Sequence, residues 1–208
     1  MNKKLLLNHL NQSGFSNEII TAFNAVKRED FIPQEFKKQA YENIPLPIGF
    51  GATISQPYTI AFMLSLLEIT NLGVSEKSRP LKILEVGSGS GYVLALINVI
   101  CKNCKIYGIE LIRDLSLRSQ EILREKPNIM IFNRNGSKGL EEYSPYDRII
   151  VSASADKINQ ELIKELNYNG VLVIPVGNSI IKLKKKYREN EITEYPGFVF
   201  VPLIDKER

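Results

Sequence analysis

The sequence of 208 residues is poor in the side chains that most hydrolases and metal enzymes need. It has one histidine, His9, and two cysteines, Cys101 and Cys104. A serine nucleophile such as Ser55 would have only the distant His9 as a base, so no catalytic triad can be assembled. One C-x-x-C pair and a remote histidine do not supply four zinc ligands. Because a Walker lysine loop and a carboxylate cluster are also missing, we expect no metal site.

The two cysteines follow the end of an expected helix and precede an expected strand. A redox role is favoured at the start of a helix, where the helix dipole lowers a thiol pKa. We therefore interpret Cys101 and Cys104 as small, semi-buried structural residues, with a redox pair as the alternative. His9 lies among leucines at helical spacing and is interpreted as a packed or surface residue.

Long apolar runs are missing as well. No stretch of about 18 apolar residues is present, as a membrane-spanning helix requires, and the apolar part of residues 1–8 is too short for a signal peptide. We therefore expect a cytoplasmic protein that does not contact a membrane. Hydrophobic residues make up 44% of the chain, which is enough for one core in a single domain over residues 1–208.

The net charge of +4 permits contact with nucleic acid without requiring it. Much of the positive excess comes from residues 180–187, IIKLKKKY. These lysines either bind RNA or an acidic partner, or they keep an edge strand from pairing with another sheet. We prefer the second interpretation and expect no nucleic-acid partner.

The chain is organised around residues 81–92, LKILEVGSGSGY. The apolar residues within 83–86 predict a strand that is buried on both faces. Gly87, Gly89 and Gly91 then allow a ligand to approach the main chain at the start of a helix. Their spacing differs from the G-x-G-x-x-G of dinucleotide sites, so a different ligand is expected. A tight turn without a ligand is the alternative.

Two acidic residues indicate which ligand this is. Glu85 precedes the glycines by two residues, where a carboxylate would repel a pyrophosphate but attract a sulfonium or an ammonium group. Glu110 ends the next apolar strand, where a carboxylate can bind both hydroxyls of a ribose. Together they point to S-adenosylmethionine, whose demethylated product is S-adenosylhomocysteine. In a later loop, Asn135 can offer an amide to an adenine edge and Gly136 lets the backbone close on the ring. A polar turn without a ligand is the alternative, and this loop taken alone favours it.

From residue 81 onward strand and helix patterns alternate, which predicts an α/β fold with a doubly wound, mostly parallel sheet. Two later strand-like runs predict a C-terminal antiparallel hairpin at the sheet edge. Strands are expected at 81–86, 105–110, 128–132, 147–152 and 171–176, helices near 90–100, 113–125 and 157–166, and the hairpin at 179–187 and 197–203. Asn169 and Gly170 are expected to close the last helix.

Residues 1–72 differ from the cofactor-binding sheet expected over 81–208. They predict two or three helices, an extended proline-punctuated loop at 44–57 and a further helix over 58–68. In a doubly wound sheet a ligand binds beyond the carboxyl ends of the strands, at the point where the strand order reverses. We therefore expect the loops 87–91, 110–113, 133–139 and 152–155 to meet there.

Seven blocks of this sequence occur in the same order in one known family. They are REDFIP at 28–33, YENIPLPIG at 41–49, TISQP at 53–57, LEVGSGSGY at 84–92, SPYDRIIV at 144–151, VIPVG at 173–177 and FVPL at 200–203. On these blocks the chain resembles the protein-L-isoaspartate O-methyltransferase family over nearly its whole length. Many methyltransferases share the glycine turn, whereas the blocks at 45–49 and 53–57 make the resemblance specific.

The resemblance implies a Rossmann-like class I methyltransferase that acts on L-isoaspartyl residues of damaged proteins and peptides. It would transfer a methyl group from S-adenosylmethionine to the α-carboxylate, which starts repair through a succinimide. Ser55 matches the active-site serine and would orient the acceptor carboxylate by a hydrogen bond, with a helix cap before Pro57 as its alternative role. A monomer is expected. The implied cofactor-binding residues are Thr53, Ile54, Glu85, Gly87, Ser88, Gly89, Gly91, Glu110, Leu111, Asn135 and Gly136.

At two positions the chain departs from the family pattern. The family usually has Gly-Asp-Gly where this chain has Arg134-Asn-Gly136, and Asp where this chain has Asn43. The amide oxygen of Asn135 can still accept a hydrogen bond but carries no charge, so weaker cofactor binding is expected. The sequence gives no account of position 43. A methyltransferase for another acceptor such as RNA, and a cofactor-binding module without this activity, are the alternative functions.

Overall fold

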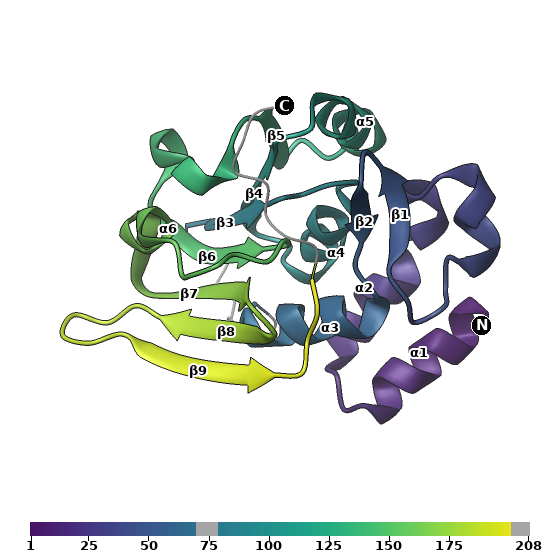
Figure 1. Cartoon of the computed structure of the whole chain (residues 1–208), viewed down its shortest axis with the longest axis horizontal. Helices are drawn as coiled ribbons and strands as arrows, with labels where there is room; N and C mark the ends of the chain where they lie inside the picture. The colour runs from purple at the N-terminus through teal and green to yellow at the C-terminus, as the bar shows by residue number, and fades with distance from the viewer. Residues whose placement is uncertain (70–78, 201–208) are drawn as a thin grey trace.

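The computed structural model describes residues 1–69 and 79–200, and its centre is one twisted sheet (Figure 1). Within the described residues, the order of its strands is β5-β4-β3-β6-β7-β8-β9. The first five strands in this order pair in parallel, and the last two pairs are antiparallel. The strands are β3 (Leu81–Val86), β4 (Cys104–Glu110), β5 (Ile129–Asn133), β6 (Tyr146–Val151), β7 (Leu166–Val176), β8 (Ser179–Lys184) and β9 (Glu191–Pro196). The order reverses between β3 and β6, which confirms the doubly wound α/β fold.

The parallel strands are apolar throughout because both faces of the sheet are covered. In β3, Ile83 packs into one hydrophobic cluster and the next residue, Leu84, packs into another on the opposite face. Ile106 and Tyr107 of β4 divide in the same way. Successive side chains of a strand point to opposite faces, so neither face can be polar where helices cover both.

Helices from the first two thirds of the chain contribute to the larger cluster. Leu6, Leu10, Ile19 and Phe23 are buried at the helical spacing that the sequence shows. These helices are α1 (Lys3–Gln12), α2 (Asn17–Ala25), α3 (Pro57–Leu66), α4 (Tyr92–Ile100) and α5 (Arg113–Leu123). The other face is covered by α6 (Gln160–Glu165), whose Leu162 is buried there. Among the described residues, no helix is long and apolar enough to cross a membrane.

Short elements complete the chain. The loop expected at 44–57 contains an antiparallel hairpin of β1 (Leu46–Gly49) and β2 (Ala52–Ile54), so its extended path is confirmed. Cys101 ends α4 and Cys104 begins β4, and both thiols are free and buried. The 3-10 helices are η1 (Arg28–Phe31), η2 (Gln34–Gln39), η3 (Gly136–Lys138) and η4 (Glu141–Tyr143).

The sequence-based assignment was wrong near the C-terminal hairpin. The last strand of the described residues is β9 at 191–196; residues 197–200 form no strand, and 201–203 lie outside the described residues. Most of β9 is exposed, so it shows no buried alternation, whereas the apolar Phe198 stacks on Phe62 outside any strand. The lysine-rich β8 lies between β7 and β9 rather than at the edge. The helix expected at 157–166 is only α6, and Asn169, with φ +60°, lies within β7 instead of closing the helix.

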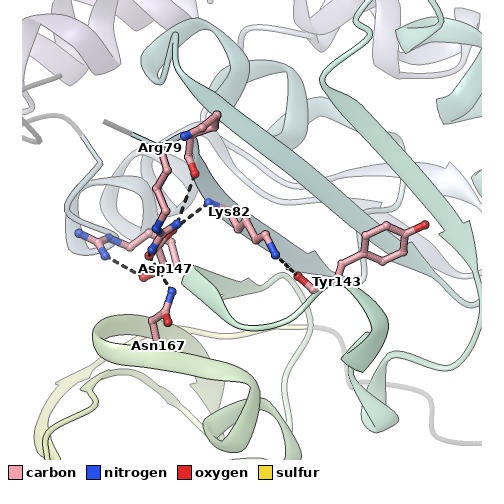
Figure 2. A network of polar contacts seen from close by, with 7 residues as sticks. Arg79, Lys82, Tyr143, Asp147 and Asn167 are labelled. Atoms are coloured by element: carbon pink, nitrogen blue, oxygen red, sulfur yellow. Dashed lines mark hydrogen bonds and ion pairs between the residues drawn. The ribbon is translucent and has the colours of Figure 1, made fainter. Parts of the chain in front are cut away.

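Asp147 ties three strands together at the end of the sheet away from the glycines (Figure 2). Its carboxylate accepts two hydrogen bonds from Arg79, at 2.8 and 2.6 Å. It also accepts the backbone N–H of Lys82 in β3 at 2.9 Å and the side-chain amide of Asn167 in β7 at 2.8 Å. Burial alone would raise the pKa of Asp147, but these donors and the charge of Arg79 outweigh burial and hold the pKa below its ordinary value.

We predict that Asp147→Asn lowers the free energy of unfolding by about 2 kcal/mol at pH 7, because the Arg79 fork loses its anionic partner. The folded state holds the Asp147 proton less tightly than the unfolded state does, so the stabilisation is present at neutral pH. It is lost as the pH falls through the lowered pKa. Urea unfolding at pH 7 and pH 3 measures this difference. Glu161→Gln, which breaks an exposed ion pair with Lys164, is the control and should change stability by less than about 1 kcal/mol. An equal effect of both substitutions would contradict the prediction.

Candidate functional site

Four loops meet where the carboxyl ends of β3, β4, β5 and β6 come together, as the sequence predicts. They form a pocket that the hairpin β1–β2 borders from the N-terminal part of the chain. In Figure 1 this hairpin stands beside α4. The residues from the four loops are Gly87, Gly89, Glu110, Leu111, Ile112, Gly136, Ser152 and Ala153, and the hairpin contributes Ile48, Phe50, Gly51, Ala52 and Thr53.

A second, smaller pocket adjoins the first on the side of α3 and α4. Ser55 and Glu85 both line it, together with Gly87 and Gly89 of the glycine turn. Thr53 borders both pockets. The glycine turn is therefore the floor that the two pockets share, and Ser55 reaches it from the hairpin side.

Positive backbone angles make the glycine turn possible. Gly87 and Gly89 have φ of +77° and +51°, a region that side-chain-bearing residues avoid. A Cβ added at Gly89 would lie 3.1 Å from Cδ1 of Ile48 in β1. Glycine therefore allows the hairpin, as well as a ligand, to come close to the turn.

Glu85 is a buried carboxyl group with one oxygen unpartnered. It is 1% exposed, and its Oε1 accepts a hydrogen bond from the hydroxyl of Ser152 at 2.6 Å. Its Oε2 has no hydrogen-bond partner among the described residues. Burial raises the pKa of Glu85 to about 8; the Ser152 hydrogen bond and the backbone of Leu94 oppose the rise, and the charge of Glu110 adds to it. A cation beside Oε2 would favour the ionised form.

Glu110 connects the glycine turn to the next strand and helix. One carboxylate oxygen accepts the backbone N–H of Gly89 at 2.7 Å, and the other accepts that of Ile112 at 2.8 Å. Burial raises the pKa of Glu110, although the backbone N–H groups of Ile112, Gly89 and Leu111 oppose the rise. The carboxylate thus fixes the loops after β3 and β4 relative to each other.

Ser55 does not cap α3. The N-cap residue of that helix is Gln56, and its side chain makes no capping bond, while Pro57 is the first helical residue. Ser55 instead lines the smaller pocket with Glu85. The alternative role that the sequence allowed for Ser55, a helix cap, is therefore wrong.

Most of the cofactor-binding residues implied by the resemblance border the two pockets, but two stand outside both linings. Gly91 is the N-cap of α4, and a Cβ there would lie 2.9 Å from Cδ1 of Leu123 in α5, so its glycine serves packing between helices. The side-chain oxygen of Asn135 accepts the backbone N–H of Ser137 at 2.9 Å, within its own turn. The residues inside the linings are Thr53, Ile54, Glu85, Gly87, Ser88, Gly89, Glu110, Leu111 and Gly136.

Sequence reasoning missed some residues that border the site. Ser152 donates a hydrogen bond to Glu85. The sequence feature that could have identified it is a small polar residue at the carboxyl end of a buried strand. Phe50 lies at the tip of the hairpin with φ +55° and is 58% exposed while bordering the larger pocket. The sequence feature that could have identified Phe50 is an aromatic residue between two glycines, Gly49 and Gly51.

The lining suits a nucleoside that carries positive charge. Among the described residues of both linings there is no lysine, arginine or histidine, whereas two carboxyl groups are present. Both carboxyl groups have raised pKa values, and one has an oxygen without a partner. Val86, Ile109 and Leu111 add an apolar wall that suits a flat ring.

The family model of protein-L-isoaspartate(D-aspartate) O-methyltransferase (PCMT) matches residues 1–208. The chain belongs to this family. A Fervidobacterium nodosum relative named protein-L-isoaspartate O-methyltransferase is 40% identical, over 96% of this chain and 100% of the relative. An Aliivibrio fischeri relative of the same name is 39% identical, over 98% of this chain and 96% of the relative.

Solved structures of the same family share the whole fold. A crystal structure of a Plasmodium falciparum protein named beta-aspartate methyltransferase (PCMT), in complex with S-adenosyl-L-homocysteine, is 26% identical to this chain. It superposes with a TM-score of 0.82 and covers 99% of this chain and 100% of that one. The family membership that the sequence blocks implied is therefore confirmed.

We predict that the protein without ligand becomes less stable as the pH rises from about 4.5 to about 8. The folded state keeps the Glu85 proton up to about pH 8, whereas the unfolded state releases it near the ordinary pKa of 4.5. Glu85→Gln, which cannot ionise, should gain relative stability over this range by about 1 kcal/mol per pH unit at most. Urea unfolding of both proteins at several pH values measures this. Parallel curves for the two proteins would refute the assignment of a raised pKa to Glu85.

Proposed function

We propose that this chain transfers a methyl group from S-adenosylmethionine to the α-carboxylate of L-isoaspartyl residues in damaged proteins and peptides. The single observation that carries the proposal is that Ser55 and the buried Glu85 line one pocket above the glycine turn, in a chain that belongs to the PCMT family over residues 1–208. Methylation turns the α-carboxylate into an ester, so the neighbouring backbone amide nitrogen can attack the ester carbonyl carbon, release methanol and close a succinimide. The succinimide then hydrolyses partly to normal aspartate.

The residues that would hold the cofactor divide between its charged and its uncharged parts. Glu85 and Glu110 suit the positive charges and the ribose hydroxyls, and Gly87 and Gly89 let these groups reach the backbone. Leu111 and Gly136 border the space for the adenine. Thr53, Ile54 and Ser88 complete the wall toward the hairpin, and Asn135 orders the turn before Gly136. When bound, S-adenosylmethionine supplies a methyl group on positively charged sulfur, which makes that carbon electrophilic.

The protein itself would act by alignment. An α-carboxylate has a pKa far below 7 and is already ionised, so no general base is required. Ser55 would donate its hydroxyl hydrogen to one carboxylate oxygen and leave the other oxygen facing the methyl group. Ile48 and Ile54, which border the same pocket, would keep water away from the reacting atoms.

The basic run at 180–187 does not favour an RNA substrate. Lys182 and Lys184 both pair with Glu68, at 2.6 and 3.2 Å. Lys185 donates to three backbone carbonyls around the end of α6, and Lys186 pairs with Glu191 at 3.4 Å. These four lysines therefore make contacts within the fold, which fasten β8 and the two residues after it to neighbouring segments.

The domain organisation, location and oligomeric state of the protein belong to the same proposal. We infer a single methyltransferase domain over residues 1–208, in which the N-terminal part borders the acceptor. One hydrophobic cluster that joins α1 and α2 to β3 and β4 supports this inference. We also infer a cytoplasmic monomer that needs no nucleic-acid partner, which sedimentation of the purified protein and fractionation of cells would test.

We predict that the protein methylates a short peptide containing L-isoaspartate and leaves the same peptide with ordinary aspartate unmodified. The two peptides differ only in which carboxylate belongs to the main chain, so the pair isolates acceptor recognition. Transfer of label from radioactive S-adenosylmethionine measures the reaction. Binding of S-adenosylhomocysteine without transfer to either peptide would contradict the proposed function and would indicate a silent module or another acceptor.

We predict that Ser55→Ala lowers kcat for the isoaspartyl peptide by roughly tenfold or more, because a hydrogen bond to a charged oxygen is lost. The affinity for S-adenosylhomocysteine, measured by calorimetry, should change less than about twofold. Ser65→Ala is a matched control in α3, since the Ser65 hydroxyl is exposed and bonds only within its helix, to the carbonyl of Phe62. Equal losses in kcat and cofactor affinity would rule out an acceptor-orienting role for Ser55.

A further inference from the structure

Residues 43–58 form a loop whose two ends meet. The loop starts at Asn43, passes through the hairpin β1–β2 and ends at Tyr58 in the first turn of α3. It carries Thr53 and Ser55 to the pocket walls. The position of these residues therefore depends on how the two ends of the loop are fastened.

A single side chain joins the two ends. Oδ1 of Asn43 accepts the backbone N–H of Tyr58 at 2.9 Å, across 15 residues of chain. The first N–H groups of a helix have no partner within the helix, and the N-cap residue Gln56 provides none through its side chain. Asn43 therefore caps the N-terminus of α3. The same bond brings together the two ends of the loop 43–58, which we call its neck.

Arg28 holds the residue next to Asn43. Its Nη2 donates to the carbonyl of Ile44 at 3.1 Å, and its guanidinium lies over the ring of Tyr92, 5.9 Å from the ring centroid. The side chain is fully buried, and Nε and Nη1 have no partner among the described residues. The bond to Ile44 is thus a main polar contact of a buried cation. Tyr92 lines the same pocket as Ser55, so Arg28 links the loop to the start of α4.

The last residue of the loop is fixed by aromatic contacts. The ring of Tyr58 packs edge-on against Phe15, with centroids 5.4 Å apart, and lies 6.3 Å from the ring of His9. His9 of α1 and Phe15, which follows α1, therefore flank the neck from outside. His9 is exposed, which fits the surface position that the sequence allowed for it.

We propose that Asn43 and Arg28 are positioning residues that close the neck of the loop 43–58 and thereby hold Ser55 against the glycine turn. The inference deepens the proposed function, because it takes Ser55 as the residue that orients the acceptor. It also gives position 43 a physical role. An aspartate there would accept the same N–H and add a negative charge at the N-terminus of α3, where the helix dipole favours it.

The test is backbone hydrogen exchange of residues 46–54, measured by mass spectrometry without cofactor or substrate. Asn43→Ala should speed exchange in this hairpin about fivefold, because a cap bond is lost. Asn43→Asp should return the rate to that of the parent protein or slow it further. For the isoaspartyl peptide, kcat/KM should fall about fivefold in Asn43→Ala and recover in Asn43→Asp.

A matched control separates local positioning from general stability. Asn190 accepts the backbone N–H of Lys186 at 3.2 Å in the turn between β8 and β9, so Asn190→Ala removes the same kind of bond far from the loop 43–58. It should leave hairpin exchange and kcat/KM unchanged. Unchanged hairpin exchange in Asn43→Ala, or an equal change in Asn190→Ala, would overturn the proposal.

A second variant and a readout that needs no ligand complete the test. If Asn43→Ala fails to fold, Arg28→Lys is measured in the same way, since it keeps the charge but shortens the reach to Ile44. Unchanged hairpin exchange in that variant would also overturn the proposal. Because exchange needs neither cofactor nor peptide, a failure of the proposed methyl transfer would leave this result intact, and the two failures can be told apart.

Discussion

The site depends on one carboxylate that joins two loops. Glu110 ends β4, yet its oxygens accept N–H groups from Gly89 after β3 and from Ile112 before α5. The backbone N–H groups of Gly87 and Ser88 add a second link, to the carbonyl of Ile109 at 2.9 and 3.0 Å. Together these bonds join two neighbouring strand ends into one floor under both pockets. This arrangement requires the carboxyl group of Glu110 to be buried, and burial raises its pKa.

A second buried acid gives the floor its preference for a cation. Glu85 lies behind the glycines, is nearly inaccessible and is repelled by the charge of Glu110. In the absence of a ligand its ionised form is therefore unfavourable. A ligand with positive sulfur and nitrogen would favour the ionised form, and a dinucleotide phosphate would disfavour it. We infer that these two side chains, rather than the sheet itself, set which of the two ligands suits the site.

The N-terminal part of the chain forms one wall of the two pockets, at the end of the sheet where the sheet itself supplies only loops. The sheet supplies the loops of the glycine side, and the opposite wall of the pockets comes from the hairpin β1–β2 and the start of α3. Ile48 comes within 3.1 Å of where a Cβ of Gly89 would be, so the hairpin and the turn fit closely. The helices α1 and α2 share one hydrophobic cluster with this hairpin and with α4. The part of the chain that borders the pockets and the part that forms the sheet therefore have a common core.

The sequence by itself determined the parallel sheet, the glycine turn and the family. Apolar runs such as 83–86 and small residues such as Gly89 leave a local signature whatever surrounds them. Glu85 could be predicted as a site residue from its neighbours in the chain, whereas Ser55 was predicted only through the resemblance to the family. The tertiary structure alone decided which groups are partners. That Ser152 binds Glu85, that Asn43 caps a helix 15 residues away and that Gly91 packs against α5 follow from distances between segments remote in sequence. The strand β9 was missed for a related reason. Its side chains are mostly exposed, so its strand conformation rests on backbone pairing with β8, and backbone pairing leaves no pattern in the side chains.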